Sequence, residues 1–255
     1  MDNLRIDYDQ LAPTYEDRYK VGSLQGISDA LLNLVDRCQP HRVLEVGCGT
    51  GHWLRELRSH PAPLYGVDAS LAMLKAGDPG SANLAAALAN SLPFRSHTFD
   101  LIFCVNALHH FDGKHAFVNQ AADLLQRPGA LSMTGIDPRQ IRKWYFYEYF
   151  EGTFERDLRR FPATGDLVNW MAAAAFDPIE CRVVEKRTVS LLGRSVFSDP
   201  FLKKSSNSQL ALLTDAEYAA GLKRIEDAIV AAEKEGREIT FVSELQFFMT
   251  TGFVR

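Results

Sequence analysis

The stretch Val43-Leu44-Glu45-Val46-Gly47-Cys48-Gly49-Thr50-Gly51 decides the fold of this 255-residue chain. Residues 42–46 predict a short apolar strand, three glycines follow at alternate positions, and a helix is predicted from Trp53 to Leu57. Glycine permits positive φ and lets backbone N–H groups approach a ligand without an intervening side chain. The N-terminus of the following helix adds positive potential that suits a carboxylate or a phosphate. The stretch therefore predicts a ligand-binding turn.

Asp68 follows the next predicted strand, 64–67, and lies 17 positions after Gly51. In an open parallel sheet, its carboxylate is expected beside the glycine turn, where it can accept both hydroxyls of a ribose. A dinucleotide fingerprint requires glycine at position 52, where this chain has His52. Glu45 also places a negative charge where a pyrophosphate is disfavoured, whereas a sulfonium cofactor tolerates it. These features favour S-adenosylmethionine, with an NAD-linked oxidoreductase as the weaker alternative.

Strand and helix signals alternate on both sides of this stretch. The predicted helices are 24–38, 71–76 and 115–125, and the further strands are 85–89, 101–106 and 130–136. Alternation of this kind is typical of right-handed βαβ units around a parallel sheet. The expected class is therefore α/β.

The last third of the chain departs from this alternation. Strands are predicted over 183–191 and 239–249, and the long insertion between them carries a helix that a capping box, Thr214-Asp215-Ala216-Glu217, opens and Gly236 closes. Long insertions in compact domains are more often functional lids than idle loops. We expect one domain, 1–255, whose cap elements are 139–175 and 192–237.

Composition and charge limit the classes of partner. Hydrophobic residues make up 46% and charged residues 24% of a chain with formal net charge −4 and no basic block, so nucleic acid is not expected as the partner. The N-terminus lacks the pattern of a signal peptide, and no apolar run approaches the roughly 18 residues of a membrane span. A cytoplasmic location is therefore expected. No metal site is predicted, because the cysteines lack ligand spacing: Cys38, Cys48, Cys104 and Cys181.

Residues 4–136 resemble the class I S-adenosylmethionine-dependent methyltransferases of the ubiquinone/menaquinone-biosynthesis type (methyltransferase domain 11/25). The resemblance rests on the glycine turn and on several motifs in order: Tyr8-Asp9-Gln10-Leu11-Ala12-Pro13-Thr14-Tyr15, Gly66-Val67-Asp68-Ala69-Ser70, Ala89-Asn90-Ser91-Leu92-Pro93-Phe94, Phe99-Asp100-Leu101-Ile102 and Arg127-Pro128-Gly129. It implies a Rossmann-like fold with a seven-stranded, mostly parallel sheet, flanking helices and a helical cap. It also implies S-adenosyl-L-methionine as cofactor, S-adenosyl-L-homocysteine as product, and an N-terminal segment, 1–22, that covers the cofactor.

By this resemblance a defined set of residues would contact the cofactor: Tyr15, Glu45, Gly47, Cys48, Gly49, Gly51, Asp68, Ala69, Ser70, Met73, Ala89, Asn90, Ser91 and Asn106. Gly47, Cys48 and Gly49 would hold the methionine end and Asp68 the ribose. Members of the family often have an acid before the alanine that meets the adenine, where this chain has Leu88. Either Asn90 replaces that acid or packing alone holds the adenine.

Methyl transfer from a sulfonium is an in-line displacement, in which orientation alone can supply about 7–11 kcal/mol. A general base is needed only where the acceptor must lose a proton. His109 and His110 follow the fourth strand, so either is a candidate base. In the alternative interpretation, one of them bonds the backbone and the other borders the cofactor.

The aromatic segment after the fifth strand provides candidate substrate residues, Trp144, Tyr145 and Tyr149, for an apolar or aromatic small molecule. Core packing of these rings is the alternative interpretation. Lys203-Lys204 is interpreted as a solvated loop, with a lid that touches an acidic substrate as the alternative. A non-catalytic S-adenosylmethionine-binding protein remains the rival from outside the enzymes.

Overall fold

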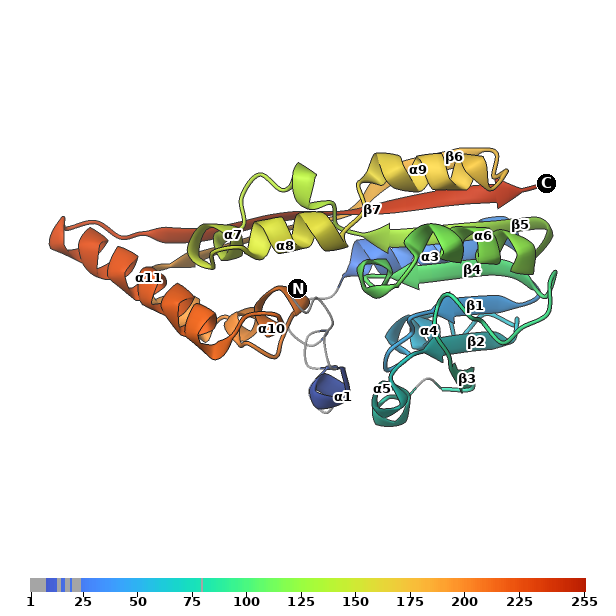
Figure 1. Cartoon of the computed structure of the whole chain (residues 1–255), viewed down its shortest axis with the longest axis horizontal. Helices are drawn as coiled ribbons and strands as arrows, with labels where there is room; N and C mark the ends of the chain where they lie inside the picture. The colour runs from blue at the N-terminus through green and yellow to red at the C-terminus, as the bar shows by residue number, and fades with distance from the viewer. Residues whose placement is uncertain (1–7, 13–14, 17–18, 20–23, 79) are drawn as a thin grey trace.

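The computed structural model describes residues 8–12, 15–16, 19, 24–78 and 80–255 (Figure 1). Its sheet has seven strands in the order β3-β2-β1-β4-β5-β7-β6. The strands are β1 (Val43–Val46), β2 (Leu64–Asp68), β3 (Asn83–Ala86), β4 (Phe99–Val105), β5 (Leu125–Gly135), β6 (Ile179–Leu192) and β7 (Thr240–Val254). Strands β1 to β5 pair in parallel, and β7 is antiparallel to both β5 and β6. The predicted seven-stranded, mostly parallel sheet is confirmed.

Helices cover the sheet and build the cap. They are α1 (Tyr8–Leu11), α3 (Gln25–Cys38), α4 (His52–Glu56), α5 (Leu71–Ala76), α6 (Lys114–Leu124), α7 (Tyr145–Tyr149), α8 (Thr153–Arg160), α9 (Thr164–Ala173), α10 (Ser208–Ala211) and α11 (Asp215–Lys234). Short 3₁₀ helices are η2 (Leu108–His110), η3 (Pro138–Gln140), η4 (Gly193–Ser198) and η5 (Pro200–Leu202). None of the described helices is long and apolar enough to cross a membrane.

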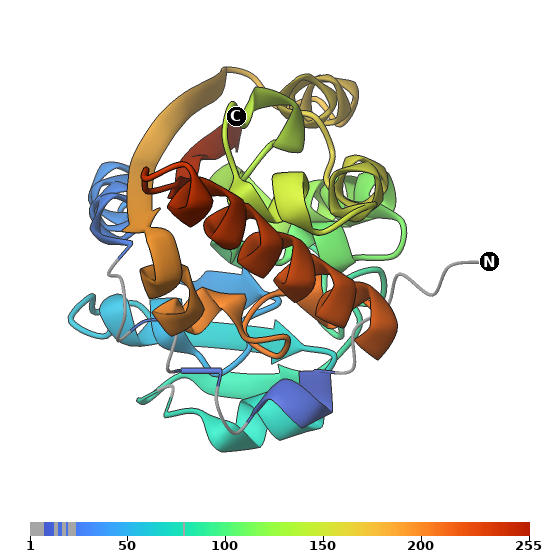
Figure 2. The ribbon, with the colours of Figure 1, turned by 90° about the vertical axis from the view of Figure 1, so that its left-hand side faces the viewer.

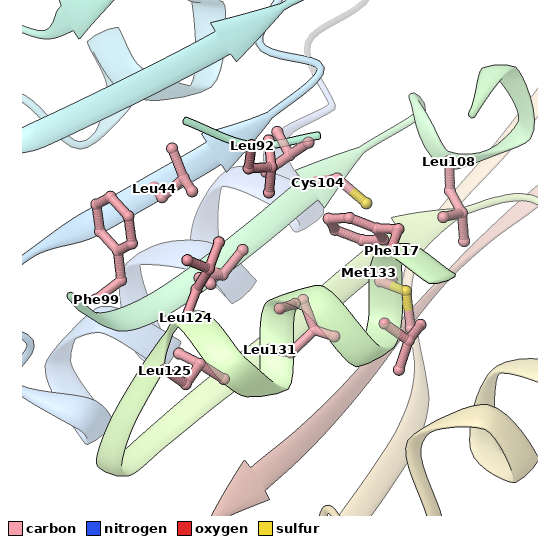
Figure 3. Packing of buried hydrophobic residues seen from close by; sticks show 14 of the residues in the cluster. Leu44, Leu92, Phe99, Cys104, Leu108, Phe117, Leu124, Leu125, Leu131 and Met133 are labelled. Carbon is pink, nitrogen blue, oxygen red and sulfur yellow. The ribbon is translucent and has the colours of Figure 1, made fainter. Parts of the chain in front are cut away.

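Strand β4 shows how the sequence builds two cores. Side chains alternate between the two faces of a strand, so consecutive residues from Leu101 to Cys104 of β4 belong to different clusters. Leu101 and Phe103 pack with α3 and α4, whereas Ile102 and Cys104 pack with α6. Figure 3 shows the second cluster, where Phe117 and Leu124 of α6 lie over β4 and β5. The continuous apolar run of β4 therefore reflects burial on both faces.

The predicted third strand was placed too far along the chain. We expected it over 85–89, but β3 covers Asn83–Ala86 and pairs with β2 from Tyr65 to Asp68. The backbone N–H of Ala87 bonds the carbonyl of Asp68, and the chain then turns away. Residues 87–89 consequently lie at the end of the sheet, where they are available to line a site.

The hairpin of β6 and β7 extends well past the rest of the sheet (Figure 1). Strand β5 pairs with β7 only from Phe248 to Val254, but β6 stays paired with β7 as far as Leu192 opposite Thr240. The outer half of the hairpin carries the cap, and α11 crosses over it (Figure 2).

The cap has an apolar core of its own. It contains Trp144, Tyr145, Phe146 and Phe150 from the aromatic segment and Ile225 and Ile229 from α11, all buried. Helix α9 does not join it, although it lies within the predicted cap segment 139–175. Its Leu167 and Met171 pack into the core of the sheet with α6, and the helix also contacts β6 and β7.

Candidate functional site

The glycine turn and the carboxyl ends of β1, β2 and β4 enclose a cavity of about 330 Å³. Ten of the fourteen predicted cofactor residues line it: Tyr15, Gly47, Gly49, Asp68, Ala69, Ser70, Met73, Ala89, Asn90 and Asn106. They come from five stretches of the chain, and the parallel sheet brings all of them except Tyr15 to one edge. The cavity lies where open α/β sheets bind ligands.

The carboxylate of Asp68 is held at the end of β2 by backbone groups. Oδ2 accepts a hydrogen bond from the N–H of Gly49 at 2.8 Å, and Oδ1 accepts one from the N–H of Ser70 at 2.8 Å. Burial raises the pKa of Asp68, and these backbone bonds oppose the rise. The backbone N–H of Ala69 also interacts with this carboxylate. Because a carboxylate has about four lone-pair sites, Asp68 can still accept a hydrogen bond from a ligand in the cavity.

Gly47 is required by both backbone and space. Its φ is +75°, and a Cβ built on it would lie 2.5 Å from the Cβ of Ala107. The backbone N–H groups of Gly47 and Cys48 both bond the carbonyl of Val67, which ties the turn to β2. The turn thus presents backbone to the cavity without side chains in the way.

Glu45 lies outside the cavity lining, fully buried at the end of β1. Neither of its carboxyl oxygens makes a hydrogen bond of normal geometry with the described residues. Burial raises the pKa of Glu45 well above its usual range, the charge of Asp68 adds to this rise, and a contact with the N–H of Leu54 offsets only part of it. A positively charged ligand beside the turn would oppose this rise in the pKa of Glu45, whereas a pyrophosphate would add to it.

Three other predicted cofactor residues also lie outside the lining. They are Cys48, Gly51 and Ser91. The side chain of Cys48 is turned into the core with Trp53 and Leu54, where burial raises the pKa of its thiol far above the usual range. Gly51 caps α4 with φ of +81°, so its role here is local geometry.

The N-terminal segment closes over this cavity. Asp9 accepts a hydrogen bond from Ser70 Oγ at 2.6 Å, and Glu16 accepts hydrogen bonds from Thr50 Oγ1 and from Arg55, the latter at 2.9 Å. Much of the predicted segment 1–22 lies outside the described residues, which here are 8–12, 15–16 and 19. The sequence motif pointed to this segment, but it did not identify Glu16 and Arg55 as the contact.

His52 occupies the position that a dinucleotide fingerprint gives to glycine. Its ring stacks on Tyr19 with centroids 3.5 Å apart and planes 3° from parallel. Burial lowers the pKa of His52, which favours the neutral ring. The side chain therefore anchors the N-terminal segment, and the turn is built differently from a dinucleotide site.

A second cavity, of about 180 Å³, lies between this site and the cap. Its aromatic wall consists of Trp144, Tyr145, Phe146, Phe161, Phe201 and Phe247. Tyr145 donates its hydroxyl proton to Asp199 at 2.7 Å. Tyr149 does not line this cavity, because its ring packs against Phe241 with centroids 5.2 Å apart. The two cavities share Tyr8, Tyr15 and Asn106.

The two candidate histidines face different cavities. His109 lines the second cavity, with its ring stacked on Phe161 at 3.9 Å between centroids. His110 lines the first cavity, and its Nε2 is hydrogen-bonded to the hydroxyl of Tyr8. Lys204, the other candidate for contact with an acceptor, forms an ion pair with Asp215 at 2.5 Å instead.

A family model described as a methyltransferase domain matches residues 44–133. The uncharacterized methyltransferase YcgJ of Bacillus subtilis is 34% identical over 96 residues, which are 35% of this chain and 38% of YcgJ. The chain spans about two fifths of the length of the curated relatives it matches. The ubiquinone/menaquinone-biosynthesis subtype stays a prediction.

Solved methyltransferase structures share the fold of the whole chain. A candidate methyltransferase from an antibiotic biosynthesis pathway of Anabaena variabilis has a TM-score of 0.69 at 19% identity, covering 88% of this chain and 96% of that one. Phosphoethanolamine N-methyltransferase 2 of Haemonchus contortus, in complex with S-adenosyl-L-methionine, has a TM-score of 0.58 at 15% identity, covering 96% and 57%. At these identities the likeness establishes the Rossmann-like class I methyltransferase fold.

Proposed function

We propose that this chain is an S-adenosylmethionine-dependent methyltransferase acting on a small molecule with an apolar or aromatic body. The junction of the two cavities at Tyr8, Tyr15 and Asn106 carries the proposal. A transferase must bring donor and acceptor together at one point while the rest of each molecule occupies its own site. The cavity at the glycine turn fits the donor, and the aromatic cavity fits the acceptor.

The chain's own residues fit this cofactor at three places. Backbone of the glycine turn would take its methionine end, Asp68 its ribose hydroxyls, and Met73 with Leu88 and Ala89 its adenine. A positively charged cofactor near the turn would favour the ionised form of the buried Glu45 and so offset part of the rise in its pKa. Bound there, S-adenosylmethionine supplies an electrophilic methyl group for in-line transfer.

The described residues of the N-terminal segment border the junction of the two cavities. Tyr8 and Tyr15 contribute to both cavities, and Asp9 and Glu16 fix the segment to the cofactor side through Ser70 and Arg55. A dry junction strengthens electrostatic interactions with developing charge.

His109 is the proposed general base for an acceptor that must lose a proton. It lines the acceptor cavity, whereas His110 is held by Tyr8 on the cofactor side. The ring of His109 stacks on Phe161 at 3.9 Å between centroids, which fixes its plane in the cavity wall. A proton leaving an acceptor in this cavity would pass to the imidazole.

Calorimetric titration with S-adenosylhomocysteine tests the proposal, with NAD as the control ligand. We expect a one-to-one complex with S-adenosylhomocysteine and no heat from NAD. Binding of NAD without binding of S-adenosylhomocysteine would favour the oxidoreductase interpretation. Binding of S-adenosylhomocysteine without methyl transfer from S-adenosylmethionine to any compound in a broad acceptor panel favours the non-catalytic binding protein.

A further inference from the structure

We infer that the acceptor carries a carboxylate, which Arg187 of the cap hairpin binds at the end of the acceptor cavity away from the methyl-transfer point. This inference rests on the proposed function, because it concerns the same cavity. Arg187 belongs to β6, and its half-buried side chain lines the cavity together with Val189 of the same strand face. Opposite them, the neighbouring strand contributes Ser243 and Leu245.

Arg187 has no anionic partner in the described part of the chain. Its guanidinium carbon lies 4.7 Å from the centroid of the Phe201 ring, and the structure shows neither a hydrogen bond nor an ion pair for it. Other arginines of the cap are paired: Arg156 with Glu217, Arg160 with Asp157, Arg194 with Glu226 and Arg224 with Glu151. Stacking on an aromatic face leaves the N–H groups at the edge of the guanidinium plane available to a ligand.

Two acids could pair with Arg187, one close to it in sequence and one in the same cavity. Both accept hydrogen bonds from other groups. Glu185, two residues before Arg187, accepts a hydrogen bond from the N–H of Gly26 at 2.7 Å, so it caps the start of α3. Asp199 accepts hydrogen bonds from the hydroxyl of Tyr145 and from the N–H of Phe201. Apart from His109, the ionisable acidic and basic residues that line the cavity are Arg187 and Asp199. Arg187 therefore supplies a positive charge that no ion pair with the described residues holds, although Asp199 lines the same cavity.

The chemistry of a single guanidinium selects the kind of anion. Its planar fork matches the two oxygens of a carboxylate in a bidentate pair. A phosphate dianion would bring a second negative charge into an otherwise aromatic cavity that already holds Asp199, with no second cation to balance it. A monoanionic carboxylate is thus the better match.

The hairpin register places this carboxylate far from the reacting atom. Asn106 lies at the junction of the two cavities, directly after the last residue of β4, Val105. Val105 pairs with Thr134 of β5, and the next β5 residue, Gly135, pairs with Phe248 of β7. Arg187 pairs with Leu245, three residues further out along β7. At a rise of 3.3–3.4 Å per residue, this offset is about 10 Å. The carboxylate therefore serves recognition and is not itself methylated.

Binding of matched acid and amide pairs tests the inference. The probes are 4-hydroxycinnamate with 4-hydroxycinnamamide and indole-3-acetate with indole-3-acetamide, titrated into the protein with saturating S-adenosylhomocysteine. We expect each acid to bind about 10- to 100-fold more tightly than its amide, the range for hydrogen bonds to charged groups. In Arg187→Met the preference should vanish, and in Arg187→Lys it should be partly retained.

A control variant separates charge from packing. Phe201→Leu removes the stacking partner but keeps the guanidinium, so it should keep a preference for acids. If Phe201→Leu loses the preference while Arg187→Met keeps it, or if the acids bind no better than the amides in the wild type, the inference is wrong. Inorganic phosphate that displaces the acids at equal concentration also contradicts it, because the site would then select phosphate.

Affinity for S-adenosylhomocysteine distinguishes this failure from failure of the proposed function. Arg187→Met should bind S-adenosylhomocysteine as the wild type does, since Arg187 does not line the cofactor cavity. Normal cofactor binding without acid preference overturns only the carboxylate inference. Absence of cofactor binding in the wild type overturns the proposed function, and the acid and amide pairs then test Arg187 in the protein alone.

Discussion

Asp68 accepts a hydrogen bond from the backbone N–H of Gly49 at 2.8 Å, so the end of one strand holds the glycine turn that follows its neighbour. This bond couples two motifs that are separate in sequence. The carboxylate adds a side-chain tie to the backbone bonds that Gly47 and Cys48 make with Val67. Asp68 therefore shapes the site as well as lining it.

Replacing Asp68 should weaken cofactor binding in two steps. Asp68→Asn keeps one acceptor oxygen and should lower affinity for S-adenosylhomocysteine about 10- to 100-fold, since bonds to charged groups are worth about 1.5–3 kcal/mol. Asp68→Ala should lose more, because the turn also loses its tie to Gly49. Calorimetry measures both, with the exposed Asp36→Asn as a matched control. Equal affinity of Asp68→Ala and wild type would remove Asp68 from the site.

Gly47→Ala should destabilise the protein more than Gly236→Ala, although both glycines have positive φ. Each substitution carries the left-handed backbone cost of about 1–2 kcal/mol. Only at Gly47 does the new Cβ also meet a neighbour, the Cβ of Ala107 at 2.5 Å, whereas nothing lies within 4 Å at Gly236. Urea unfolding of the two variants gives the difference. Adding Ala107→Gly to Gly47→Ala should restore part of the loss, and no recovery would locate the strain elsewhere.

His109→Gln should change the pH dependence of methyl transfer, and His110→Gln should not. For an acceptor that loses a proton, the rate at low pH falls because the base is protonated, and glutamine cannot show this titration. A pH–rate profile with a substrate found by screening is the measurement. An acid limb that persists in His109→Gln but disappears in His110→Gln would reverse the two roles.

The capping box of α11 should make the cap sensitive to acid. Hydrogen bonds from Thr214 and then from Arg156 lower the pKa of Glu217 from 4.5 to about 2. Because the folded value lies below the ordinary one, the ionised form stabilises the cap above about pH 4.5, and this contribution is lost as the pH falls toward 2. Glu217→Gln should therefore be less stable than wild type at pH 7, and the gap should close on acidification. A gap that is independent of pH would mean that the carboxylate charge plays no part.

Gly221→Ala should destabilise the cap, although alanine normally favours a helix interior by about 1 kcal/mol over glycine. The added Cβ would lie 2.1 Å from a ring carbon of Phe150, so α11 could not keep its present distance from that ring. The double variant Gly221→Ala with Phe150→Leu should recover stability relative to the sum of the single effects. Thermal unfolding followed by tryptophan fluorescence checks this coupling, and strictly additive losses would contradict it.

The local pattern of the sequence was enough to predict the glycine turn and the position of Asp68 beside it. The glycines at positions 47, 49 and 51 all have positive φ, and Asp68 ends β2 beside them. Some features depend only on residues that are close together in the sequence. A turn that requires glycine is one, and a strand whose residues are apolar throughout or alternate between apolar and polar is another. Such features can be recognised without a structure. The capping box at Thr214 was found for the same reason, since both of its partners lie within four residues.

Only the tertiary structure decided which side chains form the acceptor cavity. Of the three aromatic residues predicted to contact the substrate, Trp144 and Tyr145 line the cavity, whereas Tyr149 packs on Phe241. Arg187 carried no signal in the sequence, because a charged residue in an alternating strand is usually a solvated one. The position of Arg187 in the cavity depends on the register of β6 against β7. It also depends on the packing of its side chain against Phe201, which belongs to the insertion between these two strands. Such contacts join residues far apart in the chain, and packing alone selects them.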